Sequence, residues 1–139
     1  MLAGFRGVSP VDVETLRLFL HVLAAAVWVG GQLTLAALIP VLRAAGAEVP
    51  RAAARAFSRI AWPAFGVLVL TGVWNVVAGG GKGPDYQHTL ALKCTLVVAS
   101  GAAAYLHARV ASRRAMAVLG ALAGLTALAS LFVGIMLAG

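Results

Sequence analysis

The chain has 139 residues, of which 62% are hydrophobic and only 11% are charged, and its mean hydropathy is +0.97. Soluble domains are about half apolar and about a quarter charged, so these values exclude an ordinary soluble domain and indicate a membrane protein. The net charge of +7 does not indicate nucleic-acid binding, because the charges cluster between apolar runs instead of along one helix face. The single cysteine excludes an internal disulfide and a cysteine-based zinc site.

The first apolar run, residues 16–42, is long enough to cross a bilayer as a helix, because about 20 residues span the hydrocarbon core. Asp12 precedes it as a suitable helix-capping residue. A basic connection over residues 43–59 follows. Its arginines from Arg51 onward are spaced by four, which favours a helix lying at the membrane surface.

Three further membrane-spanning helices are expected at about 60–78, 88–108 and 115–137. Pro63 then lies in the first turn of its helix, where the missing N–H costs nothing. A glycine-rich loop at 79–87 and a basic connection at 109–114 separate these helices. The sequence therefore predicts an all-α polytopic membrane protein: a single domain over residues 1–139, built as a bundle of four transmembrane helices.

Four spans place the 43–59 and 109–114 connections on one side of the membrane, and both termini with the 79–87 loop on the other. The second side carries Arg6, Arg17 and Lys82, which are offset by Asp12, Glu14 and Asp85. The first side carries seven arginines, namely Arg43, Arg51, Arg55, Arg59, Arg109, Arg113 and Arg114. The positive-inside rule predicts that both termini lie outside the cytoplasm.

Polar side chains occur inside three of the spans at a similar depth. His21 lies about 5 residues, or about 8 Å, below the outer start of the first helix; Lys93 lies at a similar depth, and Asn75 slightly shallower. Because a polar group facing lipid has no partner, we expect the three to face one another inside the bundle, with His88 just above them. Each also has a structural interpretation, since Lys93 can extend to the interface and the others can hydrogen-bond between helices.

An imidazole inside a four-helix bundle can bind haem iron or a transition metal. Copper(I) prefers sulfur ligands, and sulfur is scarce here: the chain has only Met1, Met116, Met136 and Cys94. No Ser/His/Asp set, carboxylate pair or HExxH motif indicates a hydrolase, so no catalytic residue is assigned. A metal protein, a haem protein and a scaffold subunit that uses its polar groups only for packing all stay open.

Three segments together resemble the copper resistance D (CopD) family of bacterial membrane proteins. They are residues 21–23 (HVL) followed by 28–31 (WVGG), residues 55–59 (RAFSR) leading to 70–74 (LTGVW), and residues 85–93 (DYQHTLALK). The resemblance covers roughly residues 16–110, and Gln87 stands where the family usually has glycine. It implies copper uptake or tolerance at the cytoplasmic (inner) membrane, often beside a periplasmic copper-binding partner. Full-length members have about twice as many helices.

On this resemblance we expect copper ion as the bound species, with His21 as the principal ligand and His88 as an entry ligand. Lys93, Asn75 and Trp28 are then supporting residues. The same core is similar to the HemJ type of protoporphyrinogen oxidase, which implies haem b with His21 as axial ligand and Lys93 near the iron or a propionate. The expected partners are the lipid bilayer and either further copies of the chain or a partner membrane or periplasmic protein.

Overall fold

The computed structural model describes residues 11–80 and 82–139, and within these ranges the chain forms helices and turns with no strand. Met1 and Arg6 lie outside the described residues. Four helical segments are long and apolar enough to cross a membrane: Val13–Ala45, Val49–Ala78, Pro84–His107 and Arg113–Ala138. The predicted all-α, multi-pass membrane fold is confirmed.

The first segment consists of α1 (Val13–Ala25), the π-helical turn η1 (Ala26–Gly30) and α2 (Gly31–Ala45). Asp12 caps its start as predicted, because its carboxylate accepts a hydrogen bond from the Thr15 backbone N–H at 2.7 Å. The segment ends at Gly46, whose φ of 153° is open to glycine and strained for other residues. The π turn was not predicted from the apolar pattern, because one inserted residue changes the helical register without changing hydropathy.

Helix α3 spans Val49–Ala78 without interruption, so it begins about eleven residues earlier than predicted. The basic stretch is the first part of this helix and not a separate surface helix. Pro50 occupies the first turn and alanines follow, which favours helix formation from the turn onward. Pro63 consequently lies inside the helix, where the sequence analysis had placed it in the first turn; packed membrane helices tolerate such interior prolines.

Helix α4 spans Pro84–His107 and α5 spans Arg113–Ala138. Proline at the first position of α4 starts that helix four residues earlier than predicted, so His88 lies in its second turn and not at its first residue. Ser112 caps α5 by accepting a hydrogen bond from the Ala115 backbone N–H at 3.4 Å.

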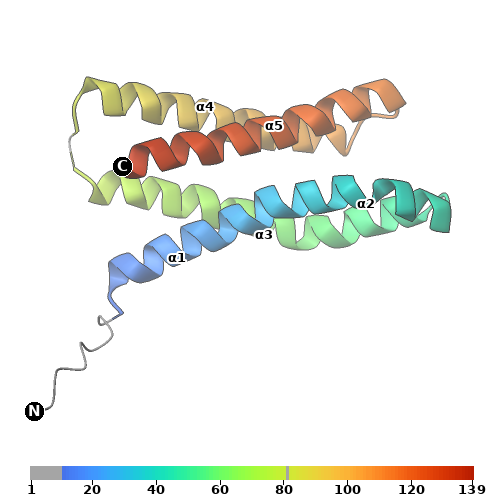
Figure 1. Cartoon of the computed structure of the whole chain (residues 1–139), viewed down its shortest axis with the longest axis horizontal. Helices are drawn as coiled ribbons and strands as arrows, with labels where there is room; N and C mark the ends of the chain where they lie inside the picture. Colours follow the sequence, from blue (N-terminus) through green and yellow to red (C-terminus); the bar gives the residue numbers. More distant parts are fainter. Residues whose placement is uncertain (1–10, 81) are drawn as a thin grey trace, which may run out of the picture.

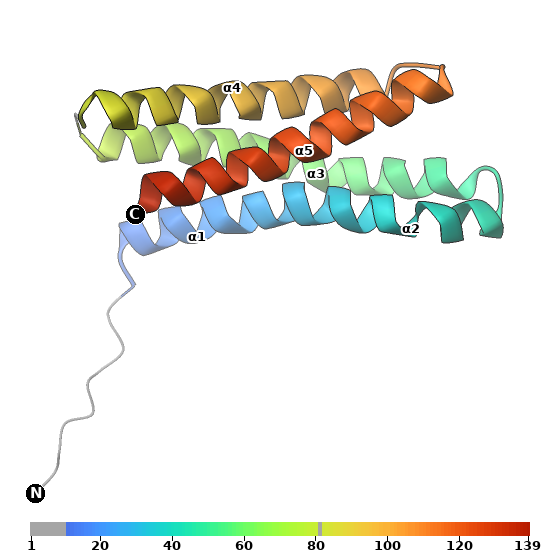
Figure 2. The same cartoon turned by 45° about the horizontal axis from the view of Figure 1, so that its top comes forward.

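The helices form two antiparallel hairpins (Figure 1). The first pairs α1, η1 and α2 with α3, the second pairs α4 with α5, and the two meet where α5 contacts η1. Helix α5 crosses the bundle obliquely, so the C-terminus lies at the same end as the start of α1 (Figure 2). The α2–α3 and α4–α5 turns lie at the opposite end, and all seven arginines of the two connections are exposed.

The packed centre is organised around Trp28 of η1. Its ring centroid lies 4.4 Å from that of Phe65 and 5.5 Å from that of Trp62, both on α3. Its indole N–H donates to the Ser100 hydroxyl of α4 at 3.0 Å, and that hydroxyl donates to the Ala123 carbonyl of α5 at 2.9 Å. Two consecutive hydrogen bonds therefore connect both hairpins at the middle of the bundle.

Close contact between α3 and α4 in this centre depends on Gly101. A Cβ atom at this position would lie 2.6 Å from Cζ of Phe65, whereas one at Gly124 of α5 would meet nothing within 4 Å.

We expect Gly101→Ala to lower the free energy of unfolding by about 1–3 kcal/mol through overpacking. The matched Gly124→Ala substitution should leave it unchanged or raise it by up to about 1 kcal/mol. Reversible unfolding in mixed micelles checks both; equal effects of the two substitutions would contradict the packing.

Candidate functional site at the outer end of the bundle

His21 lies on α1, half-buried and facing α3. Its Nδ1 lies 2.8 Å from Oγ1 of Thr71, a residue that is only 5% exposed. The Thr71 hydroxyl has one proton, which it donates to the Val67 carbonyl at 2.7 Å. The hydroxyl therefore accepts from His21, so Nδ1 carries the proton and Nε2 presents its lone pair.

One helical turn toward the outer end, Arg17 and Asn75 extend the polar row. Arg17 follows the same face of α1 as His21, and Asn75 follows the same face of α3 as Thr71. The Arg17 guanidinium lies 5.9 Å from the ring centroid of Trp74, and its side chain is 13% exposed. Arg17 Nε and Asn75 Oδ1 are buried without a hydrogen-bond partner in the described residues. The row thus keeps unused hydrogen-bonding capacity inside the bundle.

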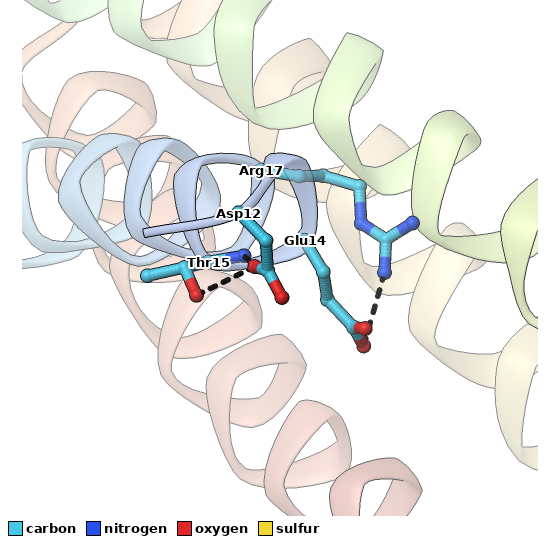
Figure 3. A network of polar contacts seen from close by, with 4 residues as sticks. All are labelled: Asp12, Glu14, Thr15 and Arg17. Atoms are coloured by element: carbon cyan, nitrogen blue, oxygen red, sulfur yellow. Dashed lines mark hydrogen bonds and ion pairs between the residues drawn. The ribbon is translucent and has the colours of Figure 1, made fainter. Parts of the chain in front are cut away.

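Figure 3 shows how the start of α1 holds Arg17 in place. The Arg17 Nη2 atom lies 3.6 Å from Oε1 of Glu14, a carboxylate that is 70% exposed. Beside it, Asp12 accepts from both the backbone N–H and the hydroxyl of Thr15 at 2.7 Å. These bonds, the backbone one first, hold the pKa of Asp12 below its ordinary value. The sequence analysis had counted Arg17 only as an outer charge; its spacing of four from His21 was the available signal.

Lys93 reaches the same region from the second hairpin. It is half-buried on α4, and its Nζ lies 3.0 Å from where a Cβ on Gly134 of α5 would be. Lys93 lies in the first half of α4 and Gly134 lies four residues before the end of α5, so both lie toward the end of the bundle that holds the start of α1. The structure therefore supports the expected approach of His21, Asn75 and Lys93 at one end of the bundle. We call Arg17, His21, Thr71, Asn75 and Lys93 the outer polar cluster, where outer means the end of the bundle that holds the start of α1.

His88 and Trp28, the two remaining predicted site residues, lie apart from this cluster. His88 is exposed in the first turns of α4, and no hydrogen bond or ion pair joins it to His21 in the described residues. Trp28 lies two helical turns, about 10 Å, deeper than His21 and belongs to the packed centre. Its indole N–H is already used by Ser100.

A metal ion would find few ligands here within one chain. Over residues 11–80 and 82–139, no three His, Cys, Asp or Glu side chains lie close enough together to hold one. Cys94, which follows Lys93 on α4, is exposed, and Met136 is 59% exposed on α5, so neither sulfur is enclosed in the bundle beside His21. His21 Nε2 is therefore a single available donor, and a complete copper site needs ligands from outside the chain.

Haem b does not fit around His21. Cε1 of the imidazole lies 3.5 Å from where a Cβ on Gly72 would be, an ordinary packing contact on α3. Two cavities, one along the α2–α3 groove and one beside Gly80 and Lys82, are lined by other residues and not by His21. A macrocycle would have to separate the helices, so we derive no chemistry through it.

Comparison with known proteins bears on the family. No curated protein and no solved structure matches the chain. A protein-family model described as Copper resistance protein D matches residues 51–138, which is α3 almost from its start, α4 and α5. The segment with His21 and Trp28 lies outside the matched range. Because the match covers well over half of the chain, the chain belongs to the copper resistance protein D (CopD) family.

Proposed function

We propose that the protein binds copper at the outer end of its bundle and helps to pass it across the cytoplasmic membrane. The observation that carries this proposal is the Thr71 hydrogen bond to His21 Nδ1, which leaves Nε2 free. Metal-binding histidines usually donate their other N–H to such a partner, because this fixes the ring and its tautomer. Membership of the copper resistance protein D family supports copper as the cargo in this proposal.

The shortage of ligands supports an assembly in place of a lone chain. Copper(I) is stable with two or three soft or imidazole ligands, and one chain offers the Nε2 of His21. A second copy of the chain, or a partner with its own copper ligands, completes the coordination in this proposal. The exposed position of His88 at the start of α4 suits it to a transient contact on the way in.

The orientation is part of the proposal. The seven exposed arginines at the end with the α2–α3 and α4–α5 turns favour the cytoplasmic side for that end. Both termini and the outer polar cluster then face the periplasmic side of the inner membrane, where copper enters.

The first prediction concerns His21 itself. In protein purified in lipid nanodiscs, His21→Ala should abolish stoichiometric copper(I) binding, because no second imidazole takes its place. His107→Ala should retain binding, since that ring donates its Nδ1 proton to the Met116 carbonyl, near the start of α5 at the other end of the bundle. Metal analysis and an absorption spectrum are measured together. A Soret band that disappears in His21→Ala would establish the haem alternative. If neither copper nor haem is detected, the scaffold role is the remaining interpretation.

The second prediction separates the ring's orientation from its presence. Thr71→Val removes the acceptor at nearly constant shape, so we expect copper(I) affinity to fall about 10–100-fold. Thr71→Ser keeps the hydroxyl and should restore most of the affinity. Competition with a colorimetric copper(I) chelator measures both, and equal affinity of the valine and wild-type proteins would contradict the positioning role.

The third prediction concerns topology. In a Cys94→Ser background, Lys82→Cys should react with a membrane-impermeant maleimide added to spheroplasts. Arg113→Cys should react only after permeabilisation, because it lies at the arginine-rich end. The reverse labelling pattern would invert the orientation and place the polar cluster at the cytoplasmic face.

A further inference from the structure

The outer polar cluster carries positive charge without an acidic partner inside the bundle. The chain has four acidic residues, namely Asp12, Glu14, Glu48 and Asp85, and each stands at or before the start of a helix. Only Glu14 approaches the cluster, at 3.6 Å from Arg17, and it is largely exposed. Lys93 has no carboxylate neighbour within ion-pair distance among the described residues.

Burial makes this imbalance significant. Arg17 is mostly enclosed between α1 and α3, and Lys93 packs its ammonium against the α5 backbone at Gly134. Charged groups at such depth normally pair with an opposite charge or mark the path of an ion. The unpartnered Arg17 Nε adds a free donor on the same face as His21. The site is therefore built to receive negative charge.

The same charges oppose a bare copper cation. Like charges in a weakly polar interior repel much more strongly than in water. A copper cation on Nε2 of His21 would share one end of the bundle with the guanidinium of Arg17, one turn away on α1, and with the ammonium of Lys93. A copper species that itself carries a negative charge removes this conflict, because Lys93 and Arg17 then attract it.

Resting on the proposed function, we propose that the outer polar cluster is an anion site that receives copper(I) as an anionic halide complex, such as dichlorocuprate. One Cu–Cl bond breaks as the Cu–Nε2 bond to His21 forms. The products are a neutral His–Cu–Cl unit and one chloride ion, so copper stays in the +1 state and charge is conserved. Lys93 and Arg17 hold the departing chloride.

The test compares copper(I) affinity in chloride and in gluconate at equal ionic strength, with the full chain in nanodiscs of neutral lipid. Chloride in solution sequesters free copper(I), so a site for the bare cation must show weaker apparent binding in chloride. We expect the opposite: the copper(I) affinity of the wild-type protein should be higher in chloride than in gluconate, by about tenfold or more.

Charge variants locate the effect. Lys93→Met should abolish the chloride enhancement, and Lys93→Arg, which keeps the charge, should retain it if that variant folds. Lys82→Met is the matched control, because it removes one exposed lysine of the outer loop beside Tyr86 and should keep the enhancement. As a readout without copper, chloride should raise the unfolding temperature of wild-type protein and not of Lys93→Met.

The outcomes separate the two proposals. Copper binding that depends on His21 but weakens in chloride overturns the anion site and leaves the proposed function intact. If the wild-type protein binds no copper through His21 in either chloride or gluconate, the proposed function is wrong. The effect of chloride on the unfolding temperature then still tests the anion site. An enhancement that persists in Lys93→Met overturns the assignment to this cluster.

Discussion

The hydrogen-bonded chain from Trp28 through Ser100 to the Ala123 carbonyl is the interaction on which the bundle depends. The two hairpins meet around the same centre, where Gly101 of α4 packs against Phe65 of α3 and Ala127 of α5 joins the cluster of Trp28 and Ala61. Lipid supplies no hydrophobic force between helices, so close packing and polar links between helices must supply the association. The first of these hydrogen bonds is donated by Trp28 of η1. The π turn, which directs Trp28 toward Ser100, is therefore a structural requirement of the fold.

The π turn also shows how the backbone of the first segment remains satisfied in the membrane. Two carbonyl groups of the π turn accept hydrogen bonds from side chains one turn further along the chain. The Gln32 side-chain amide donates to the Trp28 carbonyl at 3.0 Å, and the Thr34 hydroxyl donates to the Gly30 carbonyl at 2.8 Å. These two side-chain hydrogen bonds help to satisfy the backbone of the π turn, because an unpaired carbonyl group is costly in lipid.

The fixed centre positions the outer polar cluster. Trp28 and His21 lie on one face of the first segment, so fixing the tryptophan against Phe65 and Ser100 also fixes the rotation of α1. That rotation directs His21 toward Thr71 and Arg17 toward Trp74. The second hairpin, joined at the same centre, brings Lys93 to the region. The bundle therefore combines a packed middle with a polar end where Arg17 Nε and Asn75 Oδ1 have no hydrogen-bond partner among the described residues.

Several features of the protein were determined by its sequence alone. Long uninterrupted apolar runs specify four membrane helices because only helices satisfy every backbone group in lipid, and the positions of His21, Asn75 and Lys93 within those runs specify a shared depth. The segment motifs indicated the CopD family that the comparison then established.

Only the tertiary structure decided which polar groups meet and in what chemical state. Thr71 and Arg17 entered the cluster through helix rotation, which hydropathy does not encode, and the Thr71 contact in turn determines which nitrogen of His21 is free. Trp28 shares a face with His21 but lies about two helical turns deeper, where Ser100 takes its N–H. His88 is exposed at the start of α4, because a helix buries only one face.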